Sequence, residues 1–445
     1  MSPNSPSSPT PDAPREASSA TRSPARRRTF RRRSPWITTP LKLLFSLALT
    51  LLLIEVALRV VGIRRASREV VARSENDLHP LPFIAEAQRR GWIPWPNETR
   101  IIEGVDEHPL GRIEMRRNAE SCREDEDTPL EKPVGTKRII VLGDSHTDGF
   151  CFNAESFANQ LEKKLTAVDV VNAGFELSSP YQQWFAYDQV FRKFQPDQVL
   201  MTFYAGNDFL ELQRTDDRVH LRRAGDEFVH AEPSAGTDAT RPGEQQTASW
   251  RAWARDHLAI YEGLRRVSVL RRLVQRATED PYHDRLLAAQ ELHRGPVWQG
   301  LNQAYYFQHH ASEWDEAVAR QRWVLTTLRD ACQRDGIRLT LVILPTLRQI
   351  HPQTDREALN KIIATLQLTE DSLACDERAC QATAELAREL RIKLLDLREP
   401  FRRELEKEPK KSLFYRFDHH LNVAGHQLLA ELLRSAYESE MAIDD

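Results

Sequence analysis

The sequence predicts an α/β fold, a three-layer sandwich with a central parallel sheet and helices on both sides. Short unbroken apolar runs alternate along the chain with stretches of helical length. An unbroken apolar run is typical of a strand that is covered on both faces, and strand–helix–strand alternation favours a parallel sheet. The runs that predict the strands are Ile139–Leu142, Val168–Phe175, Gln198–Asp208, Ile337–Pro345 and Ile392–Leu397.

A serine follows the first predicted strand. The strand ends at Gly143, Ser145 lies in the polar turn after it, and Ala154–Ala167 is expected to form the next helix. Open α/β folds bind their ligands at the carboxyl edge of the sheet, so Ser145 is in the right place for chemistry. A serine in this position can instead serve only as a helix cap.

Three later blocks put polar residues or glycine in comparable positions. The second strand ends at Asn172 and Gly174, and the third ends in Gly206-Asn207-Asp208. The fourth block, Phe417–His426, reads F-D-H-H-L-N-V-A-G-H and precedes the last helix. Parallel strands bring their carboxyl ends to one edge, so these blocks are expected to meet Ser145 there.

The four blocks together resemble the SGNH (GDSL-type) hydrolase family, in its membrane-anchored bacterial type, over residues 137–437. The resemblance implies an SGNH or flavodoxin-like fold. It also implies that Ser145 is the nucleophile and that its amide, the Gly174 amide and the Asn207 side chain form the oxyanion hole. His420 then corresponds to the general base.

Two positions depart from the family pattern. The family commonly has Gly-x-Asn-Asp, whereas Ala205-Gly206-Asn207-Asp208 shifts the glycine by one place and leaves the aim of Asn207 open. Asp418 lies two residues before His420 instead of three, a spacing found in membrane-anchored and acyl-transferring relatives. The second departure therefore bears on the subclass more than on the family.

The residue types fit the chemistry of acyl transfer. A serine hydroxyl is a poor nucleophile at neutral pH, so an imidazole such as that of His420 must take its proton and return it to the leaving group. A carboxylate must hold that imidazole in one tautomer. Asp418 is the candidate, because residues two apart in an extended segment point to one face.

The remaining polar residues of these blocks have competing interpretations. Asp418, His419, His420 and His426 form a possible metal cluster, but no thiol pair or His-Glu-x-x-His pattern accompanies them, so neither a metal nor a cofactor is expected. His146 either tunes the pocket or, as we expect more, packs or faces solvent. Asp208 either caps a loop or acts in the site.

Composition predicts one catalytic domain with appendages. The chain has 445 residues, 40% of them apolar, and a net charge of −3, which gives no support to nucleic-acid binding. The expected parts are a disordered basic tail (1–35), a transmembrane signal-anchor helix (36–63), a segment that packs on the domain or forms a stalk (64–135), and the hydrolase domain (136–445) with an insertion at about 214–300. Within that insertion, residues 219–230 are expected to form a hairpin.

The membrane helix is predicted from the apolar run Leu43–Ile54 and from the arginine-rich tail before it. The run has twelve residues, short of the roughly 20 that a span requires. Snorkelling of Lys42 and pairing of Glu55 with Arg59 would extend it. The positive-inside rule then predicts a cytoplasmic N-terminus and an extracytoplasmic catalytic domain. A cleaved signal peptide and a buried helix are the alternatives.

The five cysteines are compatible with an exported domain. Cys375 and Cys380 flank an expected tight loop and are candidates for a small disulfide, and Cys122 and Cys151 are a second possible pair. Cys332 remains as a buried thiol. The sequence does not fix this connectivity.

Three functions remain open at this stage. The first is a membrane-anchored extracytoplasmic serine esterase that acts on an O-acyl or O-acetyl ester through an acyl-enzyme. The second is a cell-surface polysaccharide O-acetyltransferase, which would use the same residues. The third is a catalytically silent glycan-binding scaffold. The expected partners are an ester or acylated glycan and, through the N-terminal helix, a membrane.

Overall fold

The computed structural model describes residues 35–60, 68–72, 79–214, 218–232, 281–292, 300–351, 356–416 and 420–444. The chain divides into two units, Met1–Ala57 and Leu58–Asp445, which are described separately. The second unit contains the candidate site and every strand found among the described residues.

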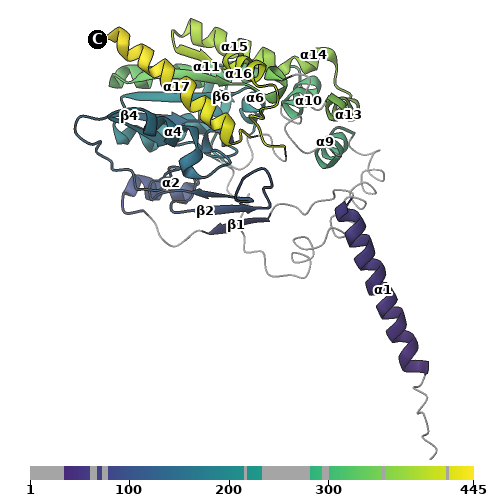
Figure 1. Cartoon of the computed structure of the whole chain (residues 1–445). Helices are drawn as coiled ribbons and strands as arrows, with labels where there is room; N and C mark the ends of the chain where they lie inside the picture. The colour runs from purple at the N-terminus through teal and green to yellow at the C-terminus, as the bar shows by residue number, and fades with distance from the viewer. Residues whose placement is uncertain are drawn as a thin grey trace, which may run out of the picture. The chain divides into compact units, whose positions relative to one another are not determined.

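A five-stranded parallel sheet forms the centre of the second unit (Figure 1), which confirms the predicted α/β architecture. Every neighbouring pair of its strands is parallel, and their order is β10-β9-β6-β4-β5. The strands are β4 (Lys137–Leu142), β5 (Val168–Asn172), β6 (Gln198–Tyr204), β9 (Arg338–Leu344) and β10 (Lys393–Asp396).

This strand order places a topological switch point between β4 and β6. The chain leaves β4 toward one side to form β5, then crosses back to form β6 on the other side of β4. Connections that diverge in this way leave a crevice outside the carboxyl ends of the two strands, where ligands of open α/β sheets bind. Ser145 follows β4 and Asn207 follows β6, so both lie at that crevice.

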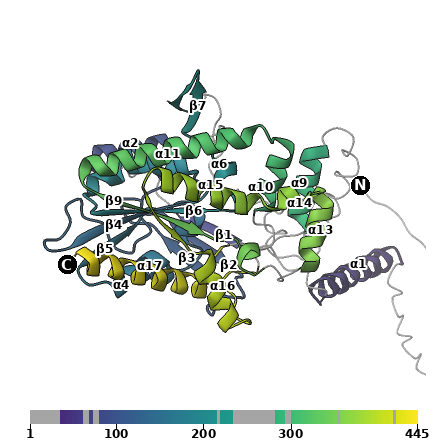
Figure 2. The same cartoon turned by 90° about the horizontal axis from the view of Figure 1, so that it is seen from above.

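Helices cover both faces of the sheet (Figure 2). One face packs against α5 (Pro180–Gln189), α11 (Glu313–Asp335) and α15 (Cys375–Glu389), and the other against α4 (Phe157–Lys164), α16 (Arg398–Lys407) and α17 (Val423–Asp444). Within β4, Ile140 and Leu142 face the first layer and Ile139 and Val141 face the second. This two-sided burial is why the strand sequence is apolar without alternation.

Shorter elements connect these layers. The helix expected at 154–167 is divided into a short 3-10 turn, η1 (Asn153–Glu155), and α4, because Ser156 caps α4 by accepting from the Asn159 amide. The other short elements are α2 (Pro82–Arg90), α3 (Ser145–Asp148), η2 (Phe191–Phe194), α6 (Asp208–Glu211), α9 (Pro281–Leu292), α10 (Leu301–His309), α12 (Leu347–Ile350), α13 (Arg356–Leu366) and α14 (Glu370–Leu373).

The segment before β4 forms a small antiparallel sheet of β1 (Arg68–Ala72), β2 (Thr99–Glu103) and β3 (Arg112–Arg116). Ile102, Ile113 and Met115 of this sheet share a buried cluster with Phe150, which lies just after α3. The small sheet therefore packs next to the loop that carries Ser145. The hairpin expected at 219–230 forms as β7 (His220–Ala224) and β8 (Glu227–Ala231), which turn at Gly225.

The prediction of a transmembrane helix at residues 36–63 is wrong. A helix does form, α1 (Pro35–Val60), but polar residues recur along it, including Lys42, Ser46, Thr50 and Glu55. Across the part of the chain that the structure describes, no helix combines the length and the apolar character that a membrane span requires.

The candidate disulfide between Cys375 and Cys380 does not form. Both residues lie on α15, where the predicted tight loop is replaced by continuous helix. Five residues of α-helix rise about 7.5 Å, which is farther than the Cα separation a disulfide bridges. All five cysteines are buried free thiols, Cys122 and Cys151 among them.

Candidate active site

Ser145 is the first residue of α3, directly after β4 and the turn residue Asp144. The Asp144 carboxylate caps α3 by accepting a hydrogen bond from the His146 amide at 2.9 Å. All four residues of α3 are buried, and Ser145 is the most accessible of them at 9% exposure. The amide of Ser145 lies in the first turn, where a helix provides no acceptor of its own. Ser145 therefore presents both a hydroxyl and an amide at the carboxyl edge of the sheet.

Two glycines allow the neighbouring chain segments to approach α3 closely. A Cβ on Gly143 would lie 2.1 Å from the hydroxyl oxygens of Thr147 and Thr202, which bond each other at 2.6 Å. A Cβ on Gly174 would lie 2.7 Å from the backbone nitrogen of Asp148. Any larger residue at position 174 would push the loop after β5 away from α3, so glycine is required there by contact.

The Gly174 amide points to Asn172 in this structure. It donates to Asn172 Oδ1 at 3.1 Å, and Asn172 Nδ2 donates to the Thr147 carbonyl at 2.9 Å. Asn172 thus ties the loop after β5 to α3. An oxyanion that binds the Gly174 amide has to share it with Asn172 or displace that acceptor.

Asn207 is held beside Ser145 by the cap residue of α3. Asn207 Nδ2 donates to Asp144 Oδ2 at 3.2 Å, which leaves its second N–H for another acceptor. Asn207 Oδ1 is buried and accepts no hydrogen bond from the described residues. The position of the amide is therefore set through Asp144.

Gly206, which lies one place from the usual glycine of the family's Gly-x-Asn-Asp pattern, has a physical reason for its position. A Cβ on Gly206 would lie 2.5 Å from a ring carbon of Tyr204, and the Tyr204 ring stacks on His146 at a centroid distance of 3.7 Å. The glycine makes room for that aromatic stack. His146 is thus buried and packed against Tyr204, one of the roles expected from the sequence. Asp208 accepts a hydrogen bond from the Tyr204 amide at 2.7 Å and so caps the end of β6.

His420 reaches this region from a position 275 residues after Ser145. It is 5% exposed. Its ring stacks on Phe150 at a centroid distance of 4.1 Å and an interplanar angle of 11°, and lies 4.8 Å from the His146 ring. His146 follows Ser145 within α3, and Phe150 lies two residues after the end of that helix, so the fold brings His420 to the same loop. The expected partner Asp418 and its neighbour His419 lie outside the described residues.

Buried carboxyl groups surround this loop. Burial raises the pKa of Asp144, and the charge of His420 acts in the opposite direction. Burial likewise raises the pKa of Glu176, which Arg100 and His420 partly offset. Glu176, two residues after Gly174, belongs to no sequence motif and was therefore not predicted as a site residue.

Two arginines from the segment before β4 bind the loop that contains α3. Arg117 pairs with Asp148 at 2.6 Å. Arg123 is completely buried, pairs with Asp148 at 3.0 Å, and donates to the carbonyls of Gly149 and Cys151. Sequence reasoning missed both, since an arginine in a charged, proline-rich stretch is usually exposed.

His426 has a structural role. Its Nδ1 accepts from the Phe157 amide at 3.3 Å, and burial lowers its pKa to about 3, so it stays neutral. The described residues include no group of three or more His, Cys, Asp or Glu side chains that could hold a metal ion.

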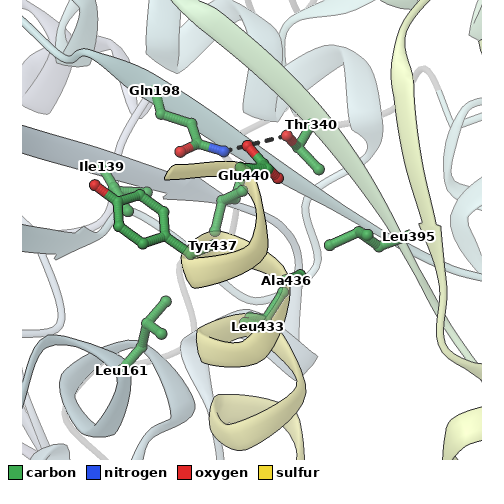
Figure 3. A pocket seen from close by; sticks show the side chains of 10 residues that line it. Ile139, Leu161, Gln198, Thr340, Leu395, Leu433, Ala436, Tyr437 and Glu440 are labelled. Carbon is green, nitrogen blue, oxygen red and sulfur yellow. Dashed lines mark hydrogen bonds between the residues drawn. The ribbon is translucent and has the colours of Figure 1, made fainter. Parts of the chain in front are cut away.

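A small cavity lies away from these groups, between the sheet and α17 (Figure 3). It measures about 10 Å³, room for about one water molecule. Its walls include Ile139 and Gln198, which lie toward the amino ends of β4 and β6. It is therefore remote from Ser145 and is no substrate pocket.

The strand order and the switch-point site define a flavodoxin-like α/β protein. Residues 302–445 match the family model described as "SGNH hydrolase-like domain, acetyltransferase AlgX". This match spans β9, β10 and α17 and includes His420. This part of the chain is therefore similar to the SGNH hydrolase-like family, which the sequence motifs also resemble.

Comparison with known proteins adds distant structural likenesses. They include the acetyl xylan esterase AlAXEase (14% identity, 67% of this chain and 98% of that chain, TM-score 0.33) and a lipase/acylhydrolase from Enterococcus faecalis (12%, 68% and 97%, 0.32). A variant of the acetyl xylan esterase Axe2 from Geobacillus stearothermophilus is similar at 13% identity, over 67% and 93% of the two chains, with a TM-score of 0.32. No curated protein matches the chain. These TM-scores are too low to add to the similarity that the family model and the motifs provide.

Proposed function

We propose that this protein is an SGNH-type serine enzyme that cleaves an O-acyl or O-acetyl ester through an acyl-enzyme on Ser145. The observation that carries the proposal is the approach of His420 to the α3 loop at the switch point, although the two residues lie 275 positions apart. The cap of α3 is Asp144, so the Ser145 hydroxyl does not serve as the helix cap.

The chemistry proceeds in two halves. The Ser145 oxygen attacks the acyl carbonyl while His420 accepts the hydroxyl proton. The negative oxygen of the tetrahedral intermediate accepts from the amides of Ser145 and Gly174 and from Asn207 Nδ2. The carbon–oxygen bond to the leaving alcohol then breaks, and His420 returns the proton to that alcohol. A second hydroxyl, with its proton taken by His420, attacks the acyl-enzyme and releases Ser145.

Asp418 is proposed to orient the His420 ring and to stabilise its positive form. This role stays a prediction, since Asp418 lies outside the described residues. Asp418→Asn tests it. The expected result is a loss of turnover of two orders of magnitude or more with little change in KM, because the amide cannot stabilise the imidazolium. Unchanged turnover would remove Asp418 from the mechanism.

The acyl acceptor decides between hydrolysis and transfer. Water as the acceptor gives an esterase. A sugar hydroxyl gives an O-acetyltransferase, which the description of the matching family model favours. The acetyl xylan esterases among the similar structures act on acetylated glycans by their names. We therefore propose an acylated glycan as the substrate class for either reaction.

The test uses the full chain and p-nitrophenyl acetate. Ser145→Ala is expected to lose nearly all turnover, and Ser439→Ala, a substitution on the exposed side of α17, is expected to retain it. Product analysis with and without a polysaccharide acceptor separates transfer from hydrolysis. If wild type and Ser145→Ala are equally inert toward many esters yet bind polysaccharide, the silent scaffold replaces the proposed enzyme.

The cellular location of the catalytic domain stays a prediction. We propose that it acts outside the cytoplasm, since acylated glycans of the cell surface are found there. Protease added to intact cells is expected to digest this domain, and protection equal to that of a cytoplasmic marker would contradict the prediction.

A further inference from the structure

The ring of Phe150 contacts both the small sheet of β1, β2 and β3 and His420. Arg100 lies on β2, and its guanidinium carbon is 5.5 Å from the centre of the Phe150 ring. The same ring stacks on His420. Phe150 thus contacts a cation from the small sheet and the imidazole of the proposed base.

Arg100 also forms an ion pair with Glu176. Glu176 belongs to the loop after β5, two residues beyond Gly174, so the pair joins the small sheet to that loop. Both side chains are about four-fifths buried. Charges screened so little by water interact strongly with their neighbours.

Glu176 and His420 affect each other electrostatically. The positive form of His420 lowers the pKa of Glu176, against the larger effect of burial. By reciprocity, the carboxylate of Glu176 favours the positive form of His420. Arg100, a cation near the same ring, opposes that form.

We propose that Arg100 and Glu176 are positioning residues that form a balanced ion pair beside His420, in which the opposite electrostatic contributions of the two residues to the base offset each other. The proposal rests on the function proposed for Ser145 and His420. The Arg100 cation alone would disfavour the imidazolium form of His420, and the Glu176 anion alone would favour it. As a pair, they contribute almost no net charge.

Other charged and titratable groups also face His420. Asp144 acts on it from the cap of α3, His146 lies 4.8 Å away, and His426 of α17 stays neutral. Asp418, two residues earlier in the chain, adds its charge if it adopts its proposed role. These groups are the same in every variant below, so differences between variants report on Arg100 and Glu176.

The size of the effect follows from the distances. Arg100 and His420 both contact Phe150, so their charged groups are no more than about 10 Å apart, where one unit charge shifts a pKa by about 0.5 to 1 unit. Removing the Arg100 cation shifts the pKa of His420 upward. Removing the Glu176 anion shifts it downward, and removing both nearly cancels the shift.

The experiment measures kcat/KM for p-nitrophenyl acetate against pH, with the full chain. Arg100→Gln is expected to move the acid limb up by about 0.5 to 1 pH unit, and Glu176→Gln to move it down by a similar amount. The double variant and Arg100→Lys are expected to stay near wild type. Arg112→Gln changes an exposed residue at the start of β3 in the same sheet; it is the matched control and is expected to leave the limb unmoved.

Opposite shifts that cancel in the double variant support the proposal, and a merely structural role does not produce them. Shifts in the same direction, or rate losses with an unmoved limb, would overturn it. Thermal melts identify any variant that fails to fold, and Arg100→Lys then provides the comparison. The proposed function fails separately, if Ser145→Ala keeps wild-type turnover. An inactive Ser145→Ala together with unmoved limbs refutes only the proposal about Arg100 and Glu176.

Discussion

Replacement of Arg123 by methionine tests how the segment before β4 supports the site. Arg123 has no exposed surface, pairs with Asp148, and donates to the backbone oxygens of Arg116, Gly149 and Cys151. Its pKa is lowered by burial, and Asp148 acts in the opposite direction. Methionine is similar in length but provides no donor, so these acceptors lose their partners.

The expected loss in the free energy of unfolding is about 3 to 5 kcal/mol, the usual cost of removing one partner from a buried ion pair. Each charge-assisted hydrogen bond contributes about 1.5 to 3 kcal/mol, so the bonds added together would exceed this range. Relaxation of the loop and the remaining pair of Asp148 with Arg117 at 2.6 Å limit the loss.

Urea unfolding followed by tryptophan fluorescence measures the change, and ester turnover is measured in parallel. Arg116→Met is the matched control, because that side chain is more than half exposed and pairs with Glu114 at the surface, where ion pairs contribute little. Equal, small losses for the two variants would refute the argument that Arg123 holds the nucleophile loop in place.

Three further predictions follow from the site and the core. Burial raises the pKa of Glu124 to about 8. Between pH 4.5 and 8 the folded state therefore keeps a proton that the unfolded state has lost. The free energy of unfolding should fall by up to about 5 kcal/mol as the pH rises through this range. Glu124→Gln should flatten that profile in urea titrations at fixed pH values, and an unchanged slope would contradict the assignment. Asn207→Ala should reduce kcat by about 100- to 1,000-fold with little change in KM, and a full rate would exclude Asn207 from the oxyanion hole. Alkylation of the denatured, unreduced protein should label both Cys375 and Cys380, whereas protection of the two together would indicate a disulfide.

The central sheet could be predicted because its strands have a simple physical cause. β4 is buried on both faces, which demands four consecutive apolar residues, Ile139–Leu142. The ends of β4 and β6 then meet at one edge whatever the loops do. Ser145 and Asn207 could be placed there from sequence alone for that reason.

The small sheet and its arginines could not be predicted in the same way. β2 and β3 are five residues each and carry charged side chains among their apolar ones. Arg123 and Arg100 are buried only because the loop around α3 offers carbonyls, carboxylates and an aromatic ring. Those partners are distant in sequence, so no local sequence pattern predicts these contacts.

The transmembrane helix and the candidate Cys375–Cys380 disulfide fail for the same reason. Each was inferred from a short sequence pattern, whereas the longer helix that contains the pattern determines the structure. The apolar run of α1 has twelve residues, and Lys42 and Glu55 bound it within a longer, mixed helix. Cys375 and Cys380 resemble a disulfide pair, but the residues from Cys375 to Glu389 include many strong helix formers and continue as α15.

The proposed mechanism requires that Ser145 is a nucleophile activated by His420. A fluorophosphonate probe added to the native full chain, followed by proteolysis and mass spectrometry, identifies the nucleophile. We expect one adduct, on the peptide that contains Ser145, and loss of that adduct in His420→Ala but not in His310→Ala, a partly exposed histidine at the end of α10. An unlabelled Ser145 in a folded protein, or labelling that is equally strong in His420→Ala, would rule out this mechanism.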